Sequence, residues 1–206
     1  MIYDYLYKIV VLGESYTGKT AIIDRYIHNR VLKNYDMTIG VDLSVKMALD
    51  NGNKLKLHIF DLTGSKNFRG IMKNYINNAI GIILVYDTTN KISFYKILEW
   101  LKLIRDNKDG VFYGILVGNK NDDEQNRKIG YSEGLDLANL YGLEFIECNI
   151  YDKSSNEIFN KLVSKINKNV DYGKNNNGVK LNIYHEKYEL LKEVEEVPEK
   201  RSYCCF

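Results

Sequence analysis

The stretch that decides the fold is Gly13-Glu14-Ser15-Tyr16-Thr17-Gly18-Lys19-Thr20, a complete phosphate-loop pattern G-x-x-x-x-G-K-[ST]. The glycines allow backbone N–H groups to close around the α- and β-phosphates of a nucleotide. We expect Lys19 to reach the β- and γ-phosphates and the Thr20 hydroxyl to bind Mg²⁺. The other nucleotide-binding residues predicted in this loop are Ser15, Tyr16, Thr17 and Gly18.

The sequence on either side of the loop supports this interpretation over a glycine-rich surface turn. Leu6–Leu12 is a short apolar run, typical of a buried parallel strand, and the residues after Thr20 have a helical pattern. A strand, a loop and a helix N-terminus in this order form a binding site for an anion.

Composition narrows the class of protein. The chain has 206 residues, is 45% hydrophobic and carries a formal net charge of +2, which argues against nucleic-acid binding. We expect neither a signal peptide nor a membrane span, because no apolar run is long enough. Three cysteines cannot form a disulfide framework, so we expect a reducing compartment.

The order of apolar patterns predicts an α/β fold. Alternating residues in 41–49 and 54–59 flank Asn51-Gly52 and predict a hairpin, hence one antiparallel edge strand. Continuous apolar runs at 80–86 and 112–117, and a weaker one at 143–148, predict parallel strands. Helical spacing appears at 94–104 and 135–141, and a last helix with an apolar face begins at a capping box, Ser154 with Glu157. We predict about six mostly parallel strands with helices on both faces and a ligand at the strands' carboxyl ends.

The composition changes after about Asn169, so we predict a domain over 1–168 and a flexible tail over 169–206. Tyr184–Val197 has apolar residues at near-helical spacing, and Pro198 ends that pattern. We expect this tail to be largely disordered, or helical when docked to a partner. From Lys168 onward it holds seven basic and seven acidic residues, which is not a polybasic membrane-binding segment.

Two further motifs predict residues that bind the nucleotide base and a metal ion. Asn119-Lys120-Asn121-Asp122 matches N-K-x-D, and the Asp122 carboxylate can accept two hydrogen bonds from guanine that adenine cannot supply. We expect the aliphatic stem of Lys120 to lie on the base and Asn119 to tie this loop to the phosphate loop. Adenine would leave the Asp122 carboxylate buried and unpaired, so Asp122 opposes the binding of ATP. Asp61-Leu62-Thr63-Gly64 matches D-x-x-G. Asp61 can hold Mg²⁺ through a water, the Gly64 N–H can meet the γ-phosphate, and Thr38 is the second candidate Mg²⁺ hydroxyl.

Together these segments resemble small GTPases of the Ras superfamily, specifically the Rab family. The similarity covers residues 4–168 and is carried by the motifs above and by Thr38–Asp42, Phe68-Arg69, Leu84–Asp87, Ser93-Phe94, Trp100-Leu101 and Cys204-Cys205. The resemblance implies a P-loop NTPase G domain and a GTP/GDP switch with Mg²⁺. It also implies nucleotide contact at Tyr35 and an effector region at Ile39, Gly40, Val41 and Asp42.

The resemblance further implies partners and a location. Exchange factors, GTPase-activating proteins, effectors and a prenyl chaperone are expected to bind a monomer. Cys204 and Cys205 resemble a double geranylgeranylation site, and two prenyl chains anchor a protein without basic residues. The expected location is the cytoplasmic face of an intracellular membrane, with a cytosolic pool. An unmodified chain end is the alternative.

The chain departs from the family pattern beside the γ-phosphate. The residue after Gly64 is normally a glutamine that orients the attacking water, whereas this chain has Ser65. Serine is too short for that role, so we predict GTP hydrolysis slowed by roughly 10- to 100-fold. The alternative is an effector-binding module of the same fold that stays in the GTP form with little or no hydrolysis.

The chain also departs from the family pattern at positions expected to lie near the guanine base. Val31 stands where the family usually has an aromatic residue, and Asn149-Ile150-Tyr151 replaces S-A-K. The Ile150 N–H can still approach the guanine O6, and Tyr151 is a further predicted nucleotide contact. Tyr16 can lean over the nucleotide or face solvent, and the sequence does not choose. These changes predict GDP release faster than is typical of the family.

Overall fold

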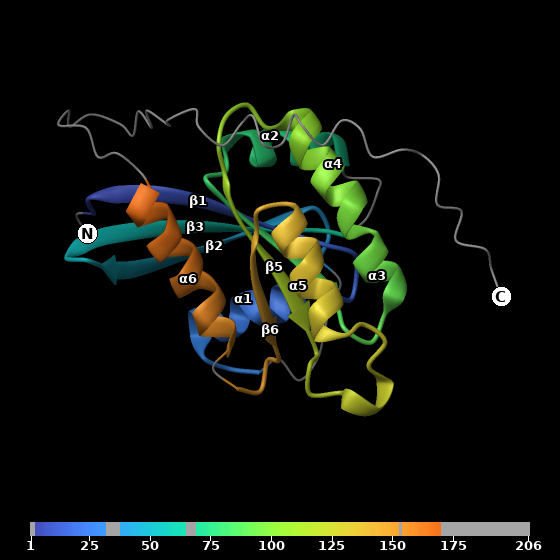
Figure 1. Cartoon of the computed structure of the whole chain (residues 1–206). Coiled ribbons are helices and arrows are strands. Elements are labelled where there is room, and N and C mark those ends of the chain that lie inside the picture. Colours follow the sequence, from blue (N-terminus) through green and yellow to red (C-terminus); the bar gives the residue numbers. More distant parts are fainter. Residues whose placement is uncertain (1–2, 32–37, 65–68, 153, 170–206) are drawn as a thin grey trace.

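The computed structural model describes residues 3–31, 38–64, 69–152 and 154–169. A six-stranded sheet in the order β2-β3-β1-β4-β5-β6 lies at the centre, with helices on both faces (Figure 1). The strands are β1 (Tyr5–Leu12), β2 (Val41–Asp50), β3 (Asn53–Leu62), β4 (Gly81–Asp87), β5 (Tyr113–Asn119) and β6 (Glu144–Cys148). The helices are α1 (Lys19–His28), α2 (Arg69–Asn78), α3 (Lys91–Tyr95), α4 (Ile97–Asn107), α5 (Tyr131–Leu140) and α6 (Ser154–Asn169), with a 3₁₀ turn, η2 (Glu124–Asn126).

The sheet confirms the predicted fold class. β2 and β3 pair antiparallel and the other neighbouring strands pair parallel, so β2 is the antiparallel edge strand. The hairpin turn has positive φ at Asn51 (50°) and Gly52 (82°), the conformation that an Asn-Gly pair favours. The apolar runs predicted to be central strands are β1, β4 and β5, and β4 is buried along its whole length.

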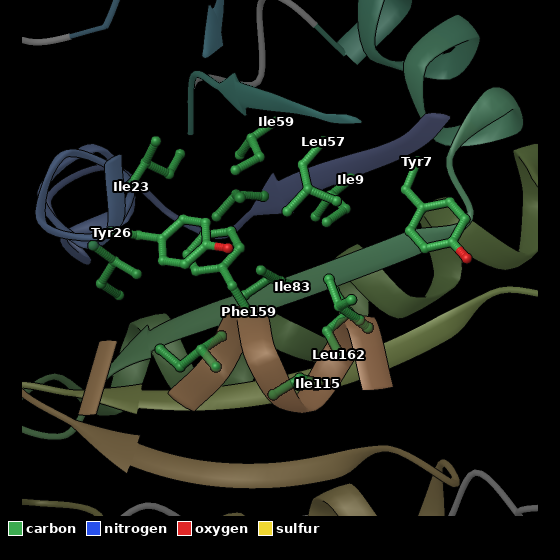
Figure 2. Close-up of a cluster of buried hydrophobic side chains, with 14 of the residues drawn as sticks. Tyr7, Ile9, Ile23, Tyr26, Leu57, Ile59, Ile83, Ile115, Phe159 and Leu162 are labelled. Atoms are coloured by element: carbon green, nitrogen blue, oxygen red, sulfur yellow. The ribbon is translucent and has the colours of Figure 1, made fainter. Parts of the chain in front are cut away.

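Two hydrophobic cores lie on opposite faces of the sheet. One is formed with α1 and α6, where Tyr26 and Phe159 stack with ring centroids 4.1 Å apart in the same cluster as Leu57 and Ile83 (Figure 2). The other is formed with α2, α4 and α5 and contains the buried Trp100. Burial on both faces explains why the central strands need continuous apolar sequences.

The helices differ from the expectation in three places. Periodicity predicted one helix over 94–104, whereas the chain forms α3 and α4 with Lys96 between them, and the Lys96 N–H donates to the carbonyls of Ile92 and Phe94. Helix α2 was not predicted. The Ser154 hydroxyl bonds to Asn149 and Asp152 rather than forming the expected capping box with Glu157. No described helix has the length and apolar character needed to cross a bilayer.

Candidate nucleotide-binding site

The phosphate loop connects β1 to α1, and close packing explains its two glycines. Gly13 has φ of 147°, and a Cβ there would lie 2.2 Å from the Val85 carbonyl oxygen. Gly18 has φ of 91°, and a Cβ there would lie 2.2 Å from Asn119 Nδ2. The glycines therefore allow the loop to pack against the ends of β4 and β5, which places it at the carboxyl edge of the sheet as predicted.

Lys19 lies inside this loop. Its side chain is buried, and Nζ donates to the carbonyl oxygens of Gly13 at 3.0 Å and Glu14 at 2.8 Å. Burial lowers the Lys19 pKa to about 8, although Asp61 and Glu14 oppose that shift. A buried ammonium group held by two neutral carbonyls would gain much from an added anion, which suits a group predicted to bind phosphate.

Three oxygen-bearing side chains converge at the start of α1. Thr20 Oγ1 donates to Asp61 Oδ2 at 2.5 Å and lies 3.0 Å from Thr38 Oγ1. Thr38 Oγ1 lies 3.4 Å from the same carboxylate oxygen. The fold thus gathers the three predicted metal-site residues, which come from three separate segments of the chain.

This donor set fits Mg²⁺, which prefers hard oxygen ligands and retains several waters. Asp61 is 3% exposed, and its Oδ1 has no hydrogen-bond partner among the described residues. Burial raises the Asp61 pKa, opposed by the Thr20 hydrogen bond and the Lys19 charge. A bound Mg²⁺ would stabilise this carboxylate, with Thr20 and Thr38 as hydroxyl ligands and Asp61 acting through a water. No group of three or more His, Cys, Asp or Glu residues suggests a different metal site in the described ranges.

The D-x-x-G segment lies directly against the phosphate loop. A Cβ on Gly64 would lie 2.2 Å from the Ser15 nitrogen and 2.4 Å from the Glu14 carbonyl carbon. The neighbouring Thr63 is 4% exposed, and its N–H donates to the Gly40 carbonyl at 3.0 Å. Thr63 therefore joins the end of β3 to the residues that precede β2.

The N-K-x-D segment is tied to the phosphate loop as predicted. Asn119 Nδ2 donates to the Thr17 carbonyl at 2.8 Å across 102 residues of sequence. Lys120 has a positive φ of 65°, and its Nζ lies 2.6 Å from Asp87 Oδ2. The Thr88 hydroxyl donates to the Lys120 carbonyl at 3.0 Å. These contacts fix the loop predicted to recognise the base relative to β4 and to the phosphate loop.

A cavity of about 400 Å³ opens between these loops, within the size range of small-ligand sites. Asp122 lines it but is exposed, so the expected burial of its carboxylate would require the base itself. Tyr16 is 64% exposed and Tyr151 is 68% exposed, and both line the cavity, whereas Val31 does not. Tyr16 thus contributes to the cavity while remaining largely exposed. The residues that line the cavity are Tyr16, Gly18, Ala21, Asn119, Lys120, Asp122, Asp123, Ile150 and Tyr151.

The loop after β6 presents a backbone donor to this cavity. Asn149 Oδ1 accepts hydrogen bonds from the N–H groups of Tyr151 at 2.9 Å and Asp152 at 3.0 Å. The intervening Ile150 N–H has no acceptor within the described part of the chain, and Ile150 lines the cavity. This arrangement leaves the Ile150 N–H available to a carbonyl oxygen such as the guanine O6.

Sequence reasoning missed two side chains that support the loop predicted to bind the base. Arg127 forms a bidentate pair with Glu147, with distances of 2.8 Å and 3.0 Å, and its Nη2 also lies 3.4 Å from the Asn121 carbonyl. The side chains of Arg127 and Glu147 are 18% and 9% exposed. Ala21 and Asp123 were also missed, although each directly follows a predicted site residue. Arg127 carried no comparable motif signal.

Other predicted residues are placed elsewhere or lie outside the described ranges. Ile39 is 79% exposed, Gly40 has φ of 82°, and Val41 and Asp42 begin β2, so the predicted effector region borders the edge strand. Tyr35, Ser65, Cys204 and Cys205 lie outside the described residues.

Comparison with known proteins agrees with this site. The sequence profile of the Ras family matches residues 8–168. The chain is 35% identical to Ras-related protein Rab-13 of Canis lupus familiaris, covering 80% of this chain and 81% of that protein. It is 36% identical to Ras-related protein SEC4 of Saccharomyces cerevisiae, covering 84% and 80% of the two chains. It is 37% identical to Ras-related protein RIC1 of Oryza sativa subsp. japonica, covering 75% and 77%. The chain therefore belongs to the Ras family and is a small GTPase of the Rab type.

Proposed function

We propose that this protein is a GTP/GDP switch that acts on intracellular membranes in vesicle-mediated transport. The proposal rests on the observation that one phosphate loop contacts both the cavity predicted to hold the base and the residues predicted to bind the metal. The Asn119 side chain joins the loop to the cavity lined by Asp122, and Thr20 joins it to Asp61 and Thr38. One nucleotide can therefore contact both sites, with guanine at Asp122 and the terminal phosphate and Mg²⁺ near Gly64.

The proposed switch depends on contacts that form only when the terminal phosphate is present. Thr38 precedes the predicted effector region, and Thr63 bonds to Gly40 within it. In the GTP form, Mg²⁺ would engage Thr38 and the γ-phosphate would meet the Gly64 N–H, which favours one conformation of the residues around Ile39–Asp42. Hydrolysis removes both interactions and releases that conformation.

We further propose that intrinsic hydrolysis is slow because Ser65 replaces the water-orienting glutamine. Phosphoryl transfer depends mainly on positioning and electrostatics, so loss of the positioning group lowers the rate without abolishing binding. The chain would then remain in the GTP form longer than relatives with glutamine. A module that binds effectors with GTP and has no measurable hydrolysis is the second candidate, and the same serine favours it.

Single-turnover hydrolysis of bound GTP separates these two candidates. We expect Ser65→Gln to raise the rate roughly 10- to 100-fold, with GDP release unchanged. Ser65→Ala is the matched control and should stay at the parental rate. If the parental protein already hydrolyses GTP as fast as the glutamine variant, slow hydrolysis is wrong; if neither protein hydrolyses GTP, the module without hydrolysis is correct.

The membrane part of the proposal depends on Cys204 and Cys205. Two geranylgeranyl groups would anchor the chain stably, and a prenyl chaperone would account for a cytosolic pool. Exchange factors and GTPase-activating proteins would set the ratio of the two nucleotide forms. A fluorescent fusion should concentrate on one internal membrane, and Cys204→Ser with Cys205→Ser should make it diffuse. An unchanged membrane pattern in that variant would contradict lipid anchoring at this site.

A further inference from the structure

Edge strand β2 presents a stripe of apolar side chains that no described element covers. The stripe consists of Leu43, Val45, Met47 and Leu49, with exposed fractions of 47%, 45%, 36% and 72%. Successive side chains of a strand point to opposite faces of the sheet. The alternate residues Lys46 and Ala48 face α1 and α6, since Lys46 Nζ donates to the Tyr26 carbonyl and Ala48 packs against the core there, so the stripe faces the other way. β2 and β3 extend from α2 and α4 toward the end of the molecule where α6 ends (Figure 1).

Basic side chains flank this stripe on the same face of the sheet. Strand register places Met47 opposite Lys56 and Leu49 opposite Lys54, while Lys8 of β1 lies opposite His58. Within the described residues, no carboxylate lies within 4.0 Å of the ammonium groups of Lys8, Lys54 or Lys56. Burial together with the charges of Lys56 and Lys8 lowers the His58 pKa, which indicates a positive local potential. The surface is therefore apolar with a basic margin, and it suits an apolar partner with an acidic margin.

The chain contains a segment with that character, residues 184–197. A helix over this segment would place Leu190, Leu191 and Val194 on one stripe, with Lys187 among them, and Glu186, Glu189, Glu193 and Glu196 on the adjoining stripe. Five glutamates against two lysines give the segment a net charge of −3. As a helix it would be about 21 Å long. The stripe from Leu43 to Leu49 is about 20 Å long, so the two lengths match.

The point where the tail begins permits this contact. Asn167 near the end of α6 hydrogen-bonds to Asp50 at the end of β2 and to Tyr7 of β1. Residues 170–183 can span up to about 45 Å when extended, enough to pass around the hairpin end of the sheet to its other face. The docked segment would remain close to its point of attachment, which keeps its effective concentration high.

We propose that residues 184–197 dock as an amphipathic helix on the β2 stripe of the same molecule, with their glutamates beside Lys54 and Lys56. A second copy of the chain fits this face less well. A two-fold contact would place Lys8, Lys54 and Lys56 against the same residues of the other copy, and like charges oppose such pairing. Because the stripe begins at Leu43, the docked tail borders the predicted effector region Ile39–Asp42 and competes with partners that extend along β2.

Methionine-methyl NMR of the full chain in its GDP form tests this contact. Met47 lies on the stripe, and Met72 is a matched control because it is 1% exposed in the opposite core. In the parental chain, we expect a soluble paramagnetic agent to broaden the Met47 signal only weakly. Leu190→Asp with Leu191→Asp should increase that broadening severalfold and leave Met72 unchanged. Equal broadening of Met47 in both proteins would overturn the proposal.

Charge reversal tests the proposed pairing. Lys54→Glu with Lys56→Glu should expose Met47 as the tail variant does, whereas Lys102→Glu, at an exposed position of α4, should not. Adding Glu189→Lys and Glu193→Lys to the variant with Lys54→Glu and Lys56→Glu should restore the protection of Met47. Failure to restore it would contradict charge-matched docking. The protection should also survive tenfold dilution; loss on dilution would assign the stripe to a second copy and reject the intramolecular contact.

Discussion

The base side and the terminal-phosphate side of the site are built differently. At the base side, the recognition loop is braced by the protein's own contacts, since Asn119 bonds to Thr17 and Arg127 holds both Glu147 and the Asn121 carbonyl. At the terminal-phosphate side, the side chains of Thr20, Thr38 and Asp61 hydrogen-bond to one another, and Asp61 Oδ1 lacks a partner among the described residues.

The contrast indicates which part of nucleotide recognition is built into the fold. A braced base site can select guanine whichever phosphates are attached, so GDP and GTP should both bind. The terminal-phosphate side depends on the ligand, because a metal and a γ-phosphate would replace the contacts among its side chains. A switch requires this combination, in which the nucleotide stays bound while one end of its site changes.

The base side should be most sensitive at Asp122. Replacement by asparagine exchanges one acceptor for a donor that faces the N1–H and 2-amino groups of guanine, so we expect GDP affinity to fall about 10⁴-fold. Asp123→Asn is the control, because Asp123 lines the same cavity without a predicted base contact. Equilibrium binding of fluorescent GDP measures both. Similar losses of GDP affinity in the two variants would contradict a specific role of Asp122 in binding guanine.

The terminal-phosphate side can be tested selectively at Gly64. An added Cβ would lie 2.2 Å from the Ser15 nitrogen, so Gly64→Ala must move this loop away from the phosphate loop. Loss of one hydrogen bond to a charged phosphate should lower GTP affinity about 10- to 100-fold, with little change for GDP. Competition between GTP and GDP for the variant measures the ratio. An equal loss for both nucleotides would show that the two sides are not independent.

The brace behind the base side can be removed at Arg127. Arg127→Gln leaves Glu147 as an unpaired, largely buried carboxylate, so we expect the free energy of unfolding to fall by about 3 kcal/mol. We also expect GDP release to become about 10-fold faster, because roughly 1.4 kcal/mol of loop positioning is lost. Arg105→Gln is the control, since that ion pair on α4 is exposed. If the variant is less stable but releases GDP at the parental rate, Arg127 stabilises the fold and has no role in nucleotide binding.

The smallest expected effect is the response of binding to pH. The Lys19 pKa is about 8 without a ligand, and phosphates favour the ammonium form, so nucleotide binding takes up a proton as the pH rises through that value. Between pH 7 and 8.5 we expect GDP affinity to fall about fourfold. Calorimetry in buffers of different ionisation enthalpy measures the proton uptake. Uptake that does not increase with pH would exclude Lys19 as the linked group.

Much of the fold could be predicted because its signals are local. Continuous apolar runs indicate β4 and β5, and Asn51-Gly52 indicates the hairpin, since a strand buried on two faces and a tight turn each restrict their own residues. The break between α3 and α4 at Lys96 was missed because the apolar spacing continues through it. Helix α2 was missed as well.

The family, the loops predicted to bind nucleotide and the absence of glutamine at position 65 could be recognised from the sequence alone, because each of these lies in a contiguous motif. Three features required the folded structure: the contacts of Arg127 with Glu147 and Asn121, the packing of Gly64 on the phosphate loop, and the exposure of the β2 stripe beside Lys54 and Lys56. These features join residues distant in sequence. Their energies depend on distance and burial, which a linear pattern does not specify.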